Sequence, residues 1–107
     1  MSKVRKQIRQ GDVLLNPINK LPPDAVKIRR RKTITLAEGE LTGHSHTVEA
    51  SVRDVETYES GGELYLKVNT TQSLRHQEHA ELAIDPGLYV VRRQTEVWMD
   101  EVRQVAD

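Results

Sequence analysis

Gly61-Gly62-Glu63-Leu64-Tyr65-Leu66-Lys67-Val68 is the segment most informative about the fold. Its glycine pair predicts a tight hairpin turn. After the turn, Leu64, Leu66 and Val68 fall on every second residue, so an extended strand would carry all three on one face. The segment therefore indicates a β-hairpin that buries the apolar side of its second strand.

Similar short apolar runs between turn signals continue on both sides of this hairpin. Asp85-Pro86-Gly87 predicts a tight turn that leads into a strand over residues 88–93. Gly11-Asp12 opens a further apolar run, which Asn16-Pro17 is expected to end. The segments that we expect to be strands are residues 13–15, 25–36, 46–50, 52–58, 64–68, 82–84 and 88–93.

The expected strand over residues 25–36 is the longest and the most charged. The run Arg29-Arg30-Arg31-Lys32 interrupts it, which indicates a bulge or the end of a strand. Its apolar residues would share one alternating face, namely Val26, Ile28, Ile34 and Leu36.

Only the end of the chain has a helical pattern. Trp98, Val102 and Val105 lie at positions i, i+4 and i+7. Together these features predict one mostly β domain over residues 1–107, built as a single small barrel or sandwich of short antiparallel strands with a short C-terminal helix. Within this domain, the basic segment 1–10 is the part that could be flexible.

The composition narrows the chemistry and the location. A chain of 107 residues can bury a modest core, and with no Phe and one Trp that core must be aliphatic. The absence of Cys excludes a disulfide scaffold, a zinc ribbon and a thiol nucleophile, and it fits a reducing compartment. No apolar stretch follows the basic start, so we expect neither a signal peptide nor a membrane span, and predict a cytoplasmic protein.

The charge of the chain is unevenly distributed although the net charge is zero. Residues 1–36 hold ten Lys or Arg against two Asp, a net charge of +8 that the remaining residues balance. This asymmetry is typical of a nucleic-acid-binding patch, in which Arg29, Arg30, Arg31 and Lys32 would contact phosphates. Alternatively, basic strands lie beside acidic ones and the charges cancel on the folded surface.

All four histidines lie in two short clusters, Gly43-His44-Ser45-His46-Thr47 and Arg75-His76-Gln77-Glu78-His79. On an extended strand, the first cluster would point both imidazoles to one face. The spacing of the second cluster suits a helical turn or a bent loop. The clusters are thirty residues apart, which is far enough for a sheet to bring them together.

Imidazoles and carboxylates are common ligands of Zn²⁺, Mn²⁺ and Fe²⁺. The candidate metal ligands are His44 and His46 together with His76 or His79, and the fourth ligand or general base would be Glu40, Glu49 or Glu78. Arg75 could hold an anionic substrate. The alternative for each cluster is a polar, solvated segment whose histidines only form hydrogen bonds.

Gly39, His44-Ser45-His46 and Glu49, followed by a later histidine, resemble the first motif of the cupin family. The segment from Gly11 to Pro17 also resembles the Gly-Asp-strand-Pro segments of cupins. Cupins are small β-barrels that commonly hold a divalent metal through three histidines and a glutamate. The resemblance implies His44, His46 and Glu49 as ligands, with His76 or His79 as the third imidazole.

Three functions are compatible with these features. The first is a metal-dependent enzyme or metal-binding barrel, in which the ion acts as a Lewis acid or activates water. The second is a metal-independent phosphodiesterase of the ribonuclease type, whose paired histidines act as general acid and base. The third is a non-catalytic module that binds RNA, DNA or a partner protein. A homodimer would be consistent with any of them, because open edge strands often pair between copies.

Overall fold

The computed structural model describes residues 6–38 and 44–93, which form antiparallel β-strands connected by turns and loops. The largest sheet has six strands in the order β1-β2-β10-β7-β6-β3. Their bounds are β1 Ile8–Gln10, β2 Val13–Ile18, β3 Val26–Lys27, β6 Val55–Ser60, β7 Glu63–Val68 and β10 Gly87–Arg93. Two further pairs are β4 (Thr33–Glu38) with β5 (Ser45–Glu49) and β8 (Gln72–Leu74) with β9 (Leu82–Ile84).

The hairpin predicted around Gly61-Gly62 is confirmed as β6 and β7. Ser60 pairs with Glu63 across the turn, and the two glycines have φ angles of 58° and 82°. These angles lie in the left-handed region, where a side chain would be strained. On β7, Leu66 and Val68 are buried and Leu64 packs beside them as a partly buried residue.

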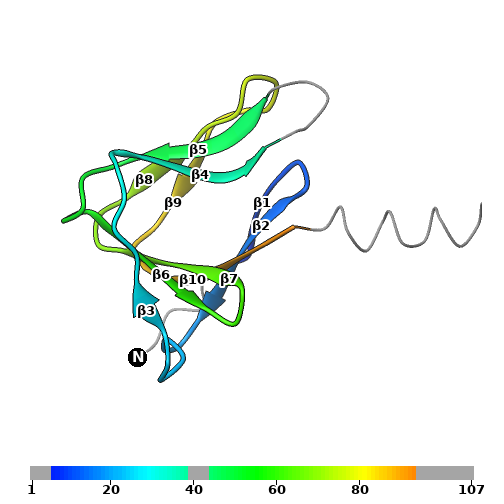
Figure 1. Ribbon diagram of the computed structural model, residues 1–107. Helices are drawn as coiled ribbons and strands as arrows, with labels where there is room; N and C mark the ends of the chain where they lie inside the picture. The colour runs from blue at the N-terminus through cyan, green and yellow to red at the C-terminus, as the bar shows by residue number, and fades with distance from the viewer. Residues whose placement is uncertain (1–5, 39–43, 94–107) are drawn as a thin grey trace, which may run out of the picture.

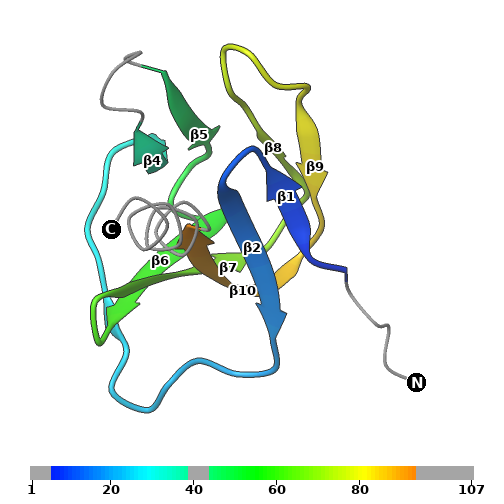
Figure 2. The ribbon, with the colours of Figure 1, turned by 90° about the vertical axis from the view of Figure 1, so that its right-hand side faces the viewer.

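The strands form two layers around the core (Figure 1). The β4–β5 and β8–β9 pairs lie above the six-stranded sheet in this view, and the β1–β2 hairpin rises towards them. An isolated bridge joins Thr47 on β5 to Arg75 just after β8. The turned view shows β1 beside β9 (Figure 2), and these two strands are in contact. In the described residues the ladders do not close into a barrel.

The core between the layers is aliphatic, as the composition predicted. Leu15, Leu66, Leu74 and Ile84 have no exposed surface. Tyr89 is the largest fully buried residue, and its hydroxyl group donates a 2.7 Å hydrogen bond to the carbonyl of Asp85. Burial of these side chains is the main favourable contribution to folding.

The prediction of one alternating face over residues 25–36 is wrong. The segment forms two strands in different sheets, because the linker that contains Arg30 separates β3 from β4. Ile34 and Leu36 are buried on β4, whereas Val26 is 63% exposed at the edge of the large sheet. The two halves of the apolar pattern therefore lie in different environments, one in the core and one at the exposed edge of the large sheet.

The expected break at Asn16-Pro17 is also wrong, since β2 continues to Ile18. β1 pairs with β2 only as far as Leu15, so Pro17 has a single neighbouring strand. Proline is tolerated at such an edge because its missing N–H leaves no ladder bond unmade there.

Two short strands, β1 and β8, were not expected from the sequence. Each has three residues, too few for an alternating pattern to stand out. The helix predicted around Trp98, Val102 and Val105 lies outside the described residues, as do residues 1–5 of the segment 1–10. No helix among the described residues is long and apolar enough to span a bilayer.

Candidate functional site

The four histidines converge although they come from two distant segments. His46 lies on β5 with His44 just before it, and His76 and His79 lie on the loop between β8 and β9. The ring centroids of His46 and His76 are 4.3 Å apart, and those of His76 and His79 are 4.5 Å apart. His44 lies 5.6 Å from His76, and His46 lies 5.9 Å from His79. The bridge between Thr47 and Arg75 holds the two segments in this register.

The turn between β1 and β2 forms a third side of this cluster. Gly11 occupies the turn with a φ of 60°, and the imidazoles pack directly against it. A Cβ atom at this position would lie 2.7 Å from Nε2 of His79 and 3.3 Å from Cε1 of His46. Only glycine therefore fits both the backbone conformation and the space.

Gln10 fixes the orientation of His46. The Gln10 side chain is buried, and its Nε2 donates 2.9 Å hydrogen bonds to the carbonyls of Leu74 and Ala80. Its Oε1 must then face His46, whose Nδ1 lies 2.9 Å away. Because this oxygen only accepts, Nδ1 of His46 carries a proton.

Asp12 faces the other nitrogen of the same ring. Its Oδ1 lies 3.2 Å from Nε2 of His46, and its Oδ2 accepts a 3.3 Å hydrogen bond from Nη2 of Arg93. In a neutral His46 with its proton on Nδ1, Nε2 is a lone-pair acceptor. A lone pair and a carboxylate oxygen at this distance repel each other, and a proton or a metal ion between them would remove this repulsion.

His76 is held in the opposite tautomer. Its Nδ1 accepts a 3.0 Å hydrogen bond from the backbone N–H of Glu78, so its proton lies on Nε2 when the ring is neutral. Oε1 of Glu78 lies 3.5 Å from Nδ1 of His44. His46 thus presents an unprotonated Nε2 and His76 a protonated one, within a single cluster.

The surroundings favour neutral imidazoles. Burial lowers the pKa of His46 below its ordinary value of 6.5, and the neighbouring His76 lowers it further, while Asp12 opposes both effects. The pKa of His76 is also lowered, first by burial and then by His79 and His44. Neutral imidazole is the form that binds metal ions and acts as a base.

The other carboxylates predicted as ligands have different positions. Glu49 is exposed, three residues after buried His46, and therefore points to the opposite face of β5. It lines a separate cavity of about 220 Å³ together with Gln72 and Arg75. The cupin resemblance implies Glu49 as a ligand, whereas on β5 its side chain lies on the other face from His46. Glu40 lies outside the described residues.

The predicted phosphate-binding residues do not form one patch. The guanidinium of Arg30 donates to backbone carbonyls, among them those of Ala50 at 2.8 Å, Ser51 at 2.9 Å and Val55 at 2.5 Å. Arg30 is therefore used in the fold, whereas its neighbours Arg29, Arg31 and Lys32 are exposed. Nε of Arg75 lies 2.7 Å from a carboxylate oxygen of Glu81.

Sequence reasoning missed Gln10 and Asp12. The one signal that could have indicated them is Gly11-Asp12, whose pattern predicts the start of a strand and resembles a cupin segment but names no site residue. As the side chains stand, no three His, Asp or Glu residues in residues 6–38 and 44–93 are arranged to hold a metal ion together. The preformed element is the pair of His46 and Asp12, with three more imidazoles beside it.

A family model described as "Domain of unknown function (DUF8820)" matches residues 9–94. The chain belongs to this family. The matched part of the DUF8820 domain contains all four histidines, Gln10, Asp12 and Arg93. The comparisons with curated proteins and with solved structures gave no match.

Proposed function

We propose that this DUF8820 domain binds a divalent transition metal ion at the histidine cluster, with His46 and Asp12 as the primary ligands. The observation that carries the proposal is the 3.2 Å approach of Nε2 of His46 to Oδ1 of Asp12, while Nδ1 of the same ring is bound to Gln10. Two ligands that bind one metal ion at about 2.1 Å stand about 3.0–3.4 Å apart. The pair therefore has the separation of adjacent ligands.

The remaining ligands would come from the other imidazoles. Rings that share a metal ion have centroids roughly 5 Å apart, from Zn–N distances of about 2.1 Å. The observed separations of 4.3–5.9 Å bracket this value, and metal binding would need changes in side-chain rotamers that turn the nitrogens towards one point. His79 is the favoured third ligand, because it is exposed on its loop and its ring forms no hydrogen bond within the described residues.

Gln10 has the role that a carboxylate or carbonyl often plays behind a metal-bound histidine. Such a partner accepts the proton of the second ring nitrogen and thereby fixes which nitrogen faces the ion. In this proposal Asp12 supplies the carboxylate that the cupin resemblance assigns to Glu49. The ligand set of imidazoles and one carboxylate suits Zn²⁺, Mn²⁺ or Fe²⁺.

The position of the cluster is suited to catalysis as well as to binding. His46 is buried at the base, whereas His79 is exposed, so a molecule from solvent can reach the outer imidazoles. A bound metal ion would supply Lewis acidity or an activated water molecule at this place. A metal-dependent enzyme is therefore the function that the cluster supports best.

Metal content tests the proposal directly. Protein purified without chelator should hold close to one equivalent of Zn²⁺, Mn²⁺ or Fe²⁺ by elemental analysis, and the stripped protein should take up Zn²⁺ in a calorimetric titration. His46→Ala and Asp12→Asn should weaken Zn²⁺ binding by more than the roughly 10- to 100-fold that loss of an outer partner costs. Glu49→Gln is the matched control and should bind as the parent does. Equal Zn²⁺ affinity in all four proteins would exclude this site.

A second candidate function is acid–base catalysis without a metal ion. It is favoured by the 4.3 Å separation of the two rings, because a neutral His46 offers a free Nε2 as base, and His76 in its imidazolium form would donate a proton as acid. Chelation separates the two functions once an activity on a phosphodiester or another substrate is found. Loss of the activity with chelator and recovery with Zn²⁺, Mn²⁺ or Fe²⁺ supports the metal enzyme. Full activity in metal-free protein supports the histidine pair.

A further inference from the structure

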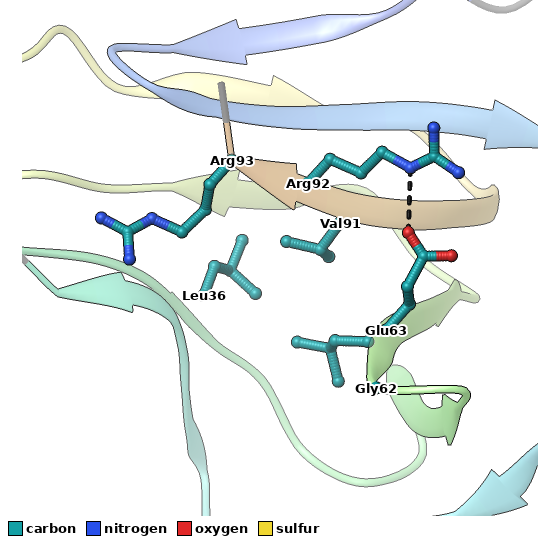
Figure 3. Close-up of a pocket in the computed structure, with 7 residues that line it drawn as sticks. Leu36, Gly62, Glu63, Val91, Arg92 and Arg93 are labelled. Atoms are coloured by element: carbon teal, nitrogen blue, oxygen red, sulfur yellow. Dashed lines mark hydrogen bonds and ion pairs between the residues drawn. The ribbon is translucent and has the colours of Figure 1, made fainter. Parts of the chain in front are cut away.

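A groove of about 530 Å³ lies on the side of β10 that faces β4 (Figure 3). Its floor is aliphatic and consists of Leu36, Leu64 and Val91. The groove has the size of a small-molecule site, and such sites combine apolar walls with a few polar groups that orient the ligand.

Each end of the groove carries an arginine that is paired with a carboxylate. At one end, Nε of Arg92 donates a 3.0 Å hydrogen bond to Glu63, so these two charges compensate each other. Arg93 lies at the other end, beyond Leu36 and Val91 (Figure 3). Within the described residues its partner is Asp12, which takes one of the five N–H donors of the guanidinium. The remaining donors are available to an anion.

Asp12 connects this groove to the histidine cluster. One of its oxygens faces Arg93 at 3.3 Å and the other faces His46 at 3.2 Å. The carboxylate therefore divides its negative charge between a groove residue and a ligand of the proposed metal site. A metal ion on Asp12 would neutralise that charge and leave Arg93 more positive towards the groove.

We infer that the groove binds a small organic anion, with its charged group on Arg93 and its apolar part over Leu36, Leu64 and Val91, and that metal binding at Asp12 strengthens this interaction. A planar guanidinium is well suited to a carboxylate or a phosphate. The binding of the anion by Arg93 is inferred from the groove alone. The strengthening of that binding by a metal ion rests on the proposed function. The coupling is reciprocal, so the anion must also raise the affinity for the metal.

Hexanoate is a suitable probe, with 1-hexanol as the neutral control. In a calorimetric or NMR titration of the full chain, hexanoate should bind and 1-hexanol should bind at least about 10-fold more weakly. Arg93→Gln should remove this preference for the anion. Arg75→Gln is the matched control, because Arg75 is likewise paired with a carboxylate but lies outside the groove. Equal binding of both probes, or unchanged hexanoate binding in Arg93→Gln, overturns the inference.

Asp12→Asn separates the groove from the metal site. Without any metal, this variant should bind hexanoate at least about 5-fold more tightly than the parent, because the competing charge is gone. Zn²⁺ should strengthen hexanoate binding in the parent by a similar factor and have no effect in Asp12→Asn. If Zn²⁺ does not bind but the metal-free comparisons hold, the metal site fails and the anion site stands. If Zn²⁺ binds normally and hexanoate does not bind, the anion site fails alone.

Segment 94–107 is the competing occupant, since it follows Arg93 directly and contains Trp98, the one Trp of the chain. If this segment fills the groove, Leu36→Asn should shift the Trp98 emission to longer wavelength and hexanoate should fail to bind. That combination overturns the inference. Trp98 emission that is the same in the parent and in Leu36→Asn, together with weaker hexanoate binding in the variant, supports it.

Discussion

At the level of single residues, the two best-placed imidazoles should differ in the nitrogen that carries the proton. Gln10 accepts from Nδ1 of His46, whereas Nδ1 of His76 accepts from the backbone of Glu78. In metal-free protein at neutral pH, ¹⁵N chemical shifts should therefore show a protonated Nδ1 in His46 and a protonated Nε2 in His76. The same tautomer in both rings would contradict the hydrogen-bond pattern on which the site is built.

The same two rings predict how stability depends on pH. Burial lowers the pKa of both His46 and His76 below the ordinary value of 6.5. Below pH 6.5 the unfolded chain takes up protons that the folded metal-free protein does not yet bind. The free energy of unfolding should therefore decrease as the pH falls from 6.5 towards the lowered pKa values, and level off above 6.5.

Urea unfolding of metal-free protein between pH 7.5 and about 5 measures this effect, since carboxylates contribute mainly at lower pH. His46→Asn removes one of the titrating rings and should make the curve less steep. A stability that stays constant or rises on acidification in this range would show that the imidazoles are not disfavoured in their charged form.

The histidines of the site could be predicted from the sequence, but their closest partners could not. A spacing of two residues puts His44 and His46 on the same face of a strand, and this pattern can be recognised without knowledge of tertiary contacts. Gln10 and Asp12 join the cluster only because the β1–β2 turn packs under the rings at Gly11. That contact depends on how the β1–β2 hairpin meets the other layer, which no local pattern specifies.

At the level of the elements, Arg30 connects the linker between β3 and β4 to the start of β6 and the loop before it. Its guanidinium donates to carbonyls of the linker itself and to those of Ala50, Ser51 and Val55. Arg30→Gln should lower the free energy of unfolding by about 1–3 kcal/mol, because it leaves several partly buried carbonyls without donors. Chemical denaturation measures this loss.

Two further variants make the test specific. Arg31→Gln is the matched control and should change stability by less than about 0.5 kcal/mol, since the side chain is exposed. Arg30→Lys should be nearly as destabilising as Arg30→Gln, because an ammonium group cannot reproduce the planar fork of donors. Full stability in Arg30→Lys would mean that the positive charge, and not the planar set of guanidinium donors, stabilises the fold at this position.

For the molecule as a whole, the strands that alternate regularly and are bounded by Gly or Pro were predictable. The hairpin of β6 and β7 and the turn into β10 follow from such patterns. The arrangement of residues 25–36 could not be predicted in this way, because a continuous apolar alternation gives no sign that its halves join different sheets. The pairing of β10 with both β2 and β7 is likewise a long-range contact that local spacing does not encode.

This arrangement gives the proposed metal ion a structural consequence. Asp12 lies in the β1–β2 turn of the six-stranded sheet, His46 lies on β5 of the β4–β5 pair, and His76 and His79 lie in the loop of the β8–β9 pair. An ion held by these residues would cross-link all three sheets, and it would bind the folded state only. At a free concentration of 100 times its Kd, Zn²⁺ should therefore add about 2.7 kcal/mol to stability and raise the Tm by roughly 10–20 °C. Glu49→Gln should show the same increase in a thermal melt, whereas His46→Ala should show little. A similar Tm increase in His46→Ala would place the stabilising ion elsewhere.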